Sequence, residues 1–247
     1  MSKLSPELKA LIADPAAKGG DVPAPSPEVT QALFGRLSSN PHIGRETWLC
    51  LAAAVLLTIN SSETLCLLYD FAKGETVKDQ VYVASCISFG GVPRSINNLG
   101  ALYSHLSYAV RDGLESDAAR TGLSKAEGLE LWKDIYGVHA DTLIEKLSAF
   151  HPDLAEYILA SHYGPLLTDP PAEPGQFRLG RVLTSVIAIA ALRAVTGVGL
   201  QVTSHVYGLK AAKDDGTVKG CKWLQSDEGC MWILRTTDDI VNTVLRS

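Results

Sequence analysis

Hydrophobic residues recur along most of this chain at spacings of three and four, which places them on one face of an α-helix. Two segments depart from this pattern because they are apolar on all sides: WLCLAAAVLLTI at 48–59 and VLTSVIAIAALRAV at 182–195. Each is shorter than the roughly 20 residues that a membrane-spanning helix needs. We therefore expect both to be buried core helices.

Start and stop signals divide the rest of the chain into further helices. Ser26 and Pro27 are typical of a helix start, and Gly74 is typical of a helix end. Strand-like alternation is weak throughout. Helices are expected over 26–37, 44–59, 62–74, 76–91, 93–113, 127–137, 141–150, 152–164, 181–195, 200–208 and 237–245. The sequence therefore predicts an all-α fold, with a leader over 1–25 and a single domain over 26–247.

Two parts of the chain resemble each other. Arg45 and Arg181 each open an apolar helix, which is followed by an amphipathic helix and a Gly-Thr type turn, LCLLYDFAKGETVKD in the first part and SHVYGLKAAKDDGTVKG in the second. Aligned on this pattern, His205 corresponds to Cys66. We expect two loosely repeated helical halves, about 26–120 and about 121–247.

The overall charge of the chain argues against two classes of partner. The 247 residues carry a formal net charge of −5, and the lysines and arginines are scattered. A nucleic-acid groove or a membrane-surface patch would need clustered positive charge. The polar N-terminus lacks the apolar region of a secretory signal. We expect a cytoplasmic protein that binds neither nucleic acid nor membrane.

The cysteines indicate free thiols. There are five, Cys50, Cys66, Cys86, Cys221 and Cys230, and no CxxC motif occurs. An odd number without close pairing is typical of an intracellular protein. Cys221 and Cys230 have no histidine between them, so zinc-ligand spacing is absent. We expect no metal and no other cofactor.

The segments FGGVPRSINNL at 89–99 and SHVYGLKAA at 204–212 resemble two motifs of the carboxymuconolactone decarboxylase and alkylhydroperoxidase D-like superfamily. The segment FGGVPRSINNL at 89–99 is similar to the family element YxGxPxxxNxL, with Gly91, Pro93 and Asn97 in place. The segment SHVYGLKAA is similar to the histidine-bearing helix LxxHxxGA, with His205 and Gly208 in place. The two-copy arrangement resembles the fungal branch of this superfamily.

The resemblance implies an all-α bundle of the alkylhydroperoxidase D-like type that assembles as a homo-oligomer. Peroxidase-type members use a CxxC pair with a histidine and a glutamate as a proton relay, whereas decarboxylase-type members act on lactone acids by proton transfer. This chain departs from both types. The cysteine pair would fall near Val198 and Gln201, and the relay glutamate near Val81 and Tyr82. The expected site has the shape of the family with altered chemistry.

Three residues are the candidates for catalysis. A buried His205 would have a lowered pKa and could exchange a proton near neutral pH; the alternative is a core histidine bonded to a carbonyl. Arg94, near a helix start, could hold an anion, or it could pair with a surface carboxylate. Tyr163 could donate to a developing oxyanion, or it could only pack at a helix end.

Seven further residues are candidates for substrate binding. His105 is a second candidate base, and Trp223 could form an aromatic wall for a flat ligand, although packing alone would also explain it. Cys66 and Cys86 lie in apolar runs, where a thiol usually acts as a small hydrophobe. The set is Cys66, Cys86, Asn97, His105, His162, Gln201 and Trp223.

These residues lead to one main functional hypothesis and two alternatives. The main hypothesis is a non-redox, metal-free lyase or isomerase that acts by proton transfer on a small carboxylated or phenolic molecule in secondary metabolism. Its reaction would be a decarboxylation, a lactone or ring rearrangement, or a ring closure. One alternative is a thiol-dependent peroxidase, which needs an exposed Cys66 or Cys86 near a second thiol. The other is a non-catalytic ligand-binding or scaffold oligomer.

Overall fold

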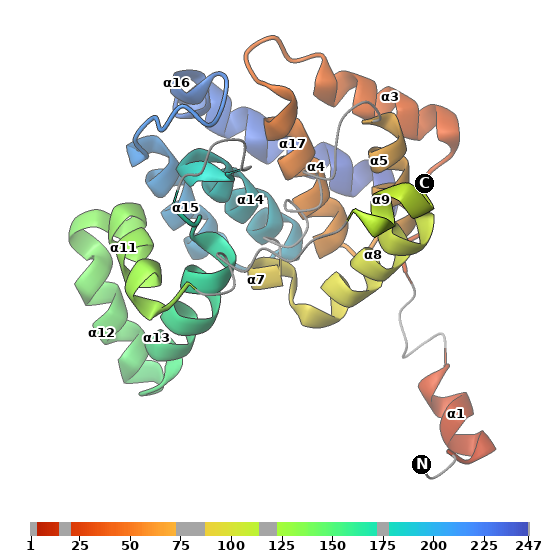
Figure 1. Ribbon diagram of the computed structural model, residues 1–247, viewed down its shortest axis with the longest axis horizontal. Coiled ribbons are helices and arrows are strands. Elements are labelled where there is room, and N and C mark those ends of the chain that lie inside the picture. The colour runs from red at the N-terminus through yellow and green to blue at the C-terminus, as the bar shows by residue number, and fades with distance from the viewer. Residues whose placement is uncertain (1–3, 15–20, 73–86, 114–122, 172–177, 247) are drawn as a thin grey trace.

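The computed structural model describes residues 4–14, 21–72, 87–113, 123–171 and 178–246 (Figure 1). Over these residues the chain is helical and contains no strand, which confirms the predicted all-α class. The α-helices are α1 (Pro6–Ile12), α3 (Pro27–Ser38), α4 (Arg45–Thr58), α5 (Ser62–Phe71), α7 (Ile87–Gly90), α8 (Val92–His105), α9 (Tyr108–Asp112), α11 (Lys125–Tyr136), α12 (Ala140–Phe150), α13 (Leu154–Tyr157), α14 (Gly180–Val195), α15 (Gly199–Ala211), α16 (Cys221–Leu224) and α17 (Asp227–Leu245). A 3-10 turn, η2 (Gly137–His139), and a π-helical segment, η3 (Ile158–Leu167), complete the described chain.

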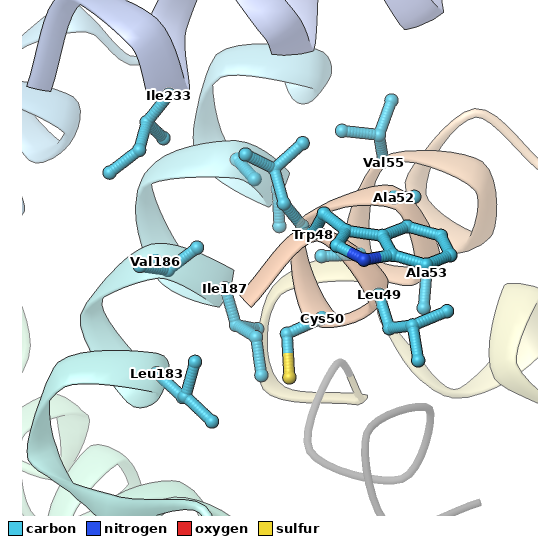
Figure 2. Packing of buried hydrophobic residues seen from close by; sticks show 14 of the residues in the cluster. Trp48, Leu49, Cys50, Ala52, Ala53, Val55, Leu183, Val186, Ile187 and Ile233 are labelled. Carbon is cyan, nitrogen blue, oxygen red and sulfur yellow. The ribbon is translucent and has the colours of Figure 1, made fainter. Parts of the chain in front are cut away.

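The two segments that are apolar on all sides form the centre of the molecule. Helices α4 and α14 pack against each other, and α17 lies against both. Residues 47–58 of α4 and 182–191 of α14 are all buried, as expected for helices without a polar face. Figure 2 shows Cys50 of α4 beside Ile187 of α14, with Ile233 of α17 above them. The predicted core helices are therefore the core helices of the structure.

A second, smaller hydrophobic cluster lies at one end of the molecule, where α11, α12, α13 and η3 gather (Figure 1). Helix α11 and η3 approach closely because glycines lie between them. A Cβ atom on Gly164 would lie 2.2 Å from the carbonyl oxygen of Ser124, and one on Gly128 would lie 2.6 Å from the nitrogen of Gly164. Phe89 of α7 packs against both this cluster and the central core. It therefore lies at their junction.

The helix pairs α4–α5 and α14–α15 share three features at one spacing. Arg45 donates from Nη2 to the carbonyl of Ala72 at 2.7 Å, and Arg181 donates from Nη2 to the carbonyl of Gly208 at 2.9 Å. Asn60 and Thr196, which follow the first helix of each pair, are the only non-glycine residues with positive φ in the described chain. Each feature recurs 136 positions later, since 45, 60 and 72 become 181, 196 and 208.

This spacing pairs His205 with Tyr69, three positions from the Cys66 that the sequence comparison paired with it. The pairing with Cys66 also used the sequences Gly74-Glu75-Thr76 and Gly216-Thr217, which lie at different distances from Arg45 and Arg181. Loops accept insertions more readily than packed helices do. The helices therefore define which residues correspond, and they pair His205 with Tyr69. Inclusion of the Gly-Thr sequences had moved this pairing to Cys66.

The structure corrects several helix boundaries. The helix expected over 93–113 is broken at Leu106, whose backbone is extended, and Ser107 caps the separate helix α9. The final helix begins at Asp227, far earlier than the expected 237, with Ser226 as its N-cap. The helix expected over 152–164 becomes α13 and η3; Pro165 has no N–H to continue an α-helical pattern, and Thr168 N instead donates to Tyr163 O. Of the helix expected over 76–91, residues 76–86 lie outside the described residues.

The expected leader, 1–25, contains two different parts. Helix α1 lies apart from the body and has no buried residue (Figure 1). Residues 21–24 are instead bonded to the corner between α4 and α5, where Val22 N donates to Asn60 O at 3.0 Å. In the part of the chain that the structure describes, no helix has both the length and the apolar character to cross a membrane.

Candidate functional site

His205 is buried in the middle of α15, with 5% of its surface exposed. The edges of two aromatic rings surround the imidazole: the ring centroids of Phe89 and Tyr136 lie 5.9 and 6.1 Å away. Its Nδ1 atom is buried and has no hydrogen-bond partner among the described residues. A buried nitrogen without a partner is uncommon, because burying a polar atom without a hydrogen bond costs free energy. This atom is therefore the starting point for a functional site.

Arg181 supplies a positive charge beside the imidazole. Its side chain is 9% exposed and donates from Nε to Asp134 Oδ2 at 2.7 Å. The same guanidinium bonds to Ser185 Oγ and to the carbonyl oxygen of Gly208. It thereby connects α11, α14 and α15, the helices that surround His205. These bonds hold the guanidinium in one orientation.

The start of α14 is shaped to hold Arg181 in this position. Gly180 has φ +74°, and a Cβ atom there would lie 2.1 Å from Thr217 Oγ1, so only glycine fits. Asp169 Oδ2 accepts from Gly180 N at 2.6 Å, and Asp215 Oδ2 accepts from Arg181 N at 3.0 Å. Carboxylates at a helix N-terminus satisfy its free N–H groups and favour its dipole.

A pair of tyrosines forms the other side of the site. Tyr136, the last residue of α11, and Tyr163 of η3 have their hydroxyl oxygens 2.9 Å apart. Trp132 fixes both rings, with centroid distances of 4.2 and 5.0 Å, and donates from Nε1 to Ala140 O at 3.0 Å. The side chains follow the order His205, Tyr136, Tyr163, so Tyr136 is the phenol next to the imidazole.

Burial determines the charges in this site. It lowers the pKa of His205 to about 4, and the positive charge of Arg181 acts in the same direction. Burial also raises the pKa of Tyr136 and raises that of Tyr163 well above the ordinary value, while Arg181 opposes both shifts. At neutral pH the site therefore presents a neutral imidazole, two neutral phenols and a guanidinium, which stays protonated even though burial lowers its pKa.

This set of groups suits proton transfer next to an oxygen that becomes negative. A neutral imidazole accepts or returns a proton, and phenols and a guanidinium stabilise an oxyanion. An aromatic surrounding of low polarity strengthens these interactions because water does not compete for them. The predicted residues His205 and Tyr163 thus lie in one cluster, connected through Tyr136.

Arg94 and Asn97 belong to a different place in the fold. Arg94 donates from Nη1 to the carbonyl oxygen of Thr58 at 2.6 Å, and Asn97 Nδ2 donates to Asn60 Oδ1 at 3.3 Å. Both contacts join α8 to the end of α4. Arg94 therefore caps a helix end in the first helix pair, whereas the guanidinium beside His205 comes from Arg181.

The candidates Cys66 and His105 also lie in the first helix pair. Cys66 is buried in α5, and burial together with nearby Asp70 and Glu63 raises its pKa. His105 is exposed at the end of α8, with Nε2 2.9 Å from Asp70 Oδ2. Cys86 lies outside the described residues.

The remaining candidates are dispersed. His162 is half-buried beside Tyr163, and Gln201 is exposed on α15, one turn before His205. Trp223 stacks on His42 with centroids 4.8 Å apart and contacts Trp232 at 5.8 Å. Among the described residues, no side-chain hydrogen bond, ion pair or ring contact joins any of these three to His205.

Arg181 and Tyr136 are the site residues that sequence reasoning missed. Arg181 was recognised only as the start of an apolar helix, although its place in the pattern shared with Arg45 fixes it opposite the histidine helix. Tyr136 closes an amphipathic helix in WKDIYG, where it looks like any helix-end aromatic. Only the packing of α11 against α15 brings it to His205.

Comparison with known proteins adds no further information about this site. No protein-family model, no curated protein and no solved structure matches the chain.

Proposed function

We propose that the protein is a non-redox enzyme of the carboxymuconolactone decarboxylase-like type, a lyase or isomerase acting on a small carboxylated or phenolic organic molecule. His205 is its general acid and base, and the Tyr136–Tyr163 pair stabilises the negative oxygen. The observation that carries this proposal is the buried Nδ1 of His205, which has no hydrogen-bond partner in the described chain. The imidazole adjoins the ring of Tyr136 and the positive charge of Arg181.

The role first given to Arg94 passes to Arg181 in this proposal. Arg181 favours binding of an anionic group near His205. Burial lowers the pKa of His205, and Arg181 lowers it further, so the imidazole is neutral before the substrate arrives. Homo-oligomer formation and a role in secondary metabolism remain part of the proposal through the family resemblance of FGGVPRSINNL and SHVYGLKAA. A cytoplasmic location remains part of it through the odd number of cysteines without close pairing.

The low pKa of His205 limits which reactions the site can support. An imidazole with a pKa of about 4 is a weak base in the free enzyme. It removes a proton efficiently only where the substrate's negative charge forms next to it, because an opposite charge raises the pKa of the imidazole. Reactions that place an enolate or a phenolate beside the imidazole meet this condition.

The described thiols do not favour the peroxidase alternative. Cys66, Cys221 and Cys230 are free and buried, and Cys50 is also buried. Burial raises the pKa of Cys66, Cys221 and Cys230, which keeps these thiols protonated and weakly nucleophilic. A thiol in this form is poorly suited to attack a peroxide.

Proton transfer can be tested before the natural substrate is known. The protein is incubated in D₂O with a panel of hydroxybenzoates, butenolide acids and β-keto acids, and deuterium incorporation or loss of CO₂ is followed by NMR. We expect exchange or turnover of at least one class, reduced by roughly 10²- to 10⁴-fold in a folded His205→Ala variant. Tyr69→Phe, at the corresponding position of the first helix pair, is the control and should retain the full rate.

Two outcomes would contradict the proposal. Equal rates for wild type and His205→Ala would remove His205 from the chemistry. Saturable binding of panel members without any exchange would favour the ligand-binding alternative.

A further inference from the structure

The hydroxyl pair Tyr136–Tyr163 always has one hydrogen left to donate. Its two oxygens share a single hydrogen bond of 2.9 Å, which uses one of their two hydrogens. If Tyr163 donates to Tyr136, the hydroxyl of Tyr136 is free to donate elsewhere, and its acidity rises because it already accepts a hydrogen bond. Tyr136 is also the phenol that adjoins His205, with ring centroids 6.1 Å apart. In this arrangement the free hydroxyl hydrogen belongs to the tyrosine whose ring adjoins the imidazole.

His205 offers the complementary group. With the imidazole hydrogen on Nε2, the unpartnered Nδ1 presents a lone pair inside the site. A ligand with one hydroxyl group can satisfy both partners at once, because it donates its hydrogen to Nδ1 and accepts from the hydroxyl of Tyr136. In this tautomer a carboxylate brings no hydrogen for Nδ1, whereas a hydroxyl group does.

The surroundings of His205 favour transfer of the ligand's hydroxyl proton away from the hydroxyl oxygen. Among the described residues, Phe89 on α7, Tyr136 on α11 and Arg181 on α14 face the imidazole. Asp134 bonds to the Nε side of Arg181 and is 44% exposed in its side chain, so its charge is partly shielded by solvent. The groups nearest the imidazole are thus neutral or positive, and they stabilise an oxyanion.

We propose that this site binds an ionisable hydroxyl group, a phenol or an enol, as its anion. The O–H bond of the ligand breaks, its electron pair stays on the oxygen, and its proton passes to Nδ1 of His205, which becomes an imidazolium. The oxyanion accepts a hydrogen bond from the hydroxyl of Tyr136, which Tyr163 supports from behind. This inference rests on the proposed function and narrows its substrate class to phenols and to carbonyl compounds that react through an enol.

The probe for this inference is 4-nitrophenol, because its neutral and ionised forms absorb at different wavelengths. Wild-type protein is titrated at a pH where the free probe is mostly neutral, and the spectrum of the bound probe is recorded. We expect saturable binding with the phenolate spectrum. The matched ligand 4-nitroanisole, which has no ionisable hydrogen, should bind more weakly and show no spectral change.

Two variants test the assigned groups, and a third controls for general effects. Tyr136→Phe removes one hydroxyl and should weaken phenolate binding by about 10- to 100-fold, the loss expected for one hydrogen bond to a charged group. His205→Gln should leave the bound probe in its neutral form. Tyr207→Phe changes a tyrosine on α15 that is 71% exposed and should behave like wild type.

The inference is overturned if 4-nitrophenol does not bind, if it binds with the neutral spectrum, or if Tyr207→Phe has the same effect as Tyr136→Phe. These failures are separate from failure of the proposed function. Exchange that depends on His205 without phenolate binding would leave the enzyme proposal standing and end this inference. Phenolate binding without any His205-dependent reaction would leave this inference standing and end the enzyme proposal.

Discussion

The helix pairs α4–α5 and α14–α15 share the same backbone arrangement but carry different side chains at the inward-facing position. Each begins with a Gly-Arg dipeptide, and each arginine donates to a carbonyl at the end of the second helix. In the second pair the position facing inward is His205, buried under α11, whereas Tyr69 at the same position of the first pair is half-buried beside His105 of α8. The shared arrangement of each pair therefore fixes the position of the inward-facing residue, and the helix packed against the pair determines how deeply that residue is buried.

The arginines should differ most in their contribution to stability. Arg181→Ala removes bonds to Asp134, Ser185 and Gly208 within a buried site, and we expect a loss of about 3 kcal/mol in the free energy of unfolding. Arg45→Ala is the matched change at a half-buried position, and about 1 kcal/mol is expected.

Urea unfolding of both variants at neutral pH measures these losses. Equal losses for Arg45 and Arg181 would show that the two arginines have the same structural role, against the contrast drawn here.

The second prediction concerns the loss of stability in acid, because only the second helix pair has a histidine at the inward-facing position. The folded pKa of about 4 lies below the unfolded value of about 6.5, so the unfolded chain binds the proton first as the pH falls. Stability should therefore be highest above pH 6.5 and fall by up to about 3 kcal/mol between roughly pH 6.5 and pH 4.

The variant His205→Gln should lack this part of the acid loss. Urea midpoints of both proteins are compared at intervals across this pH range. Parallel curves for wild type and variant would contradict a buried, neutral His205.

Replacement by alanine should cost different amounts of stability at Gly44 and Gly180, the residues directly before Arg45 and Arg181. Gly180→Ala places Cβ 2.1 Å from Thr217 Oγ1 at a residue with φ +74°, and a loss of about 2 kcal/mol is expected. Gly44→Ala meets Glu46 Oε2 at 2.8 Å, the end of a flexible side chain, at φ −87°. Its cost should stay within about 0.5 kcal/mol.

Thermal unfolding of the two glycine variants gives the comparison. A larger effect at Gly44 than at Gly180 would mean that the two helix starts have been assigned the wrong roles.

The smallest expected difference lies at the positive-φ residues between the paired helices. Thr196 has φ 66°, a conformation that is strained for a β-branched residue, so Thr196→Gly should stabilise the protein by about 0.5 to 1 kcal/mol. Asn60 has φ 60° but bonds to Asp21 and accepts from Asn97 and Asn98. Asn60→Gly should therefore bring no gain.

High-precision chemical unfolding resolves changes of this size. Stabilisation by Asn60→Gly would show that its side-chain bonds contribute little to the corner between α4 and α5.

The sequence alone determined the helical class, the core helices and the inward position of a histidine. A helix that is apolar on all sides can only be buried. The apolar segments 48–59 and 182–195 therefore predict α4 and α14 to within a few residues. It did not determine the break at Leu106, because an apolar residue in an extended conformation leaves no local signal there.

The tertiary structure decided which groups share the site. Tyr136 and His205 are far apart in the chain and meet only because α11 packs on α15, and Arg181 rather than Arg94 reaches them because the first turn of α14 is held by Asp169 and Asp215. Local pattern reports which face of a helix is buried; it carries no information about the partner that buries it. That partner depends on how the whole chain packs, and here the packing decides the charge and the chemistry of the imidazole.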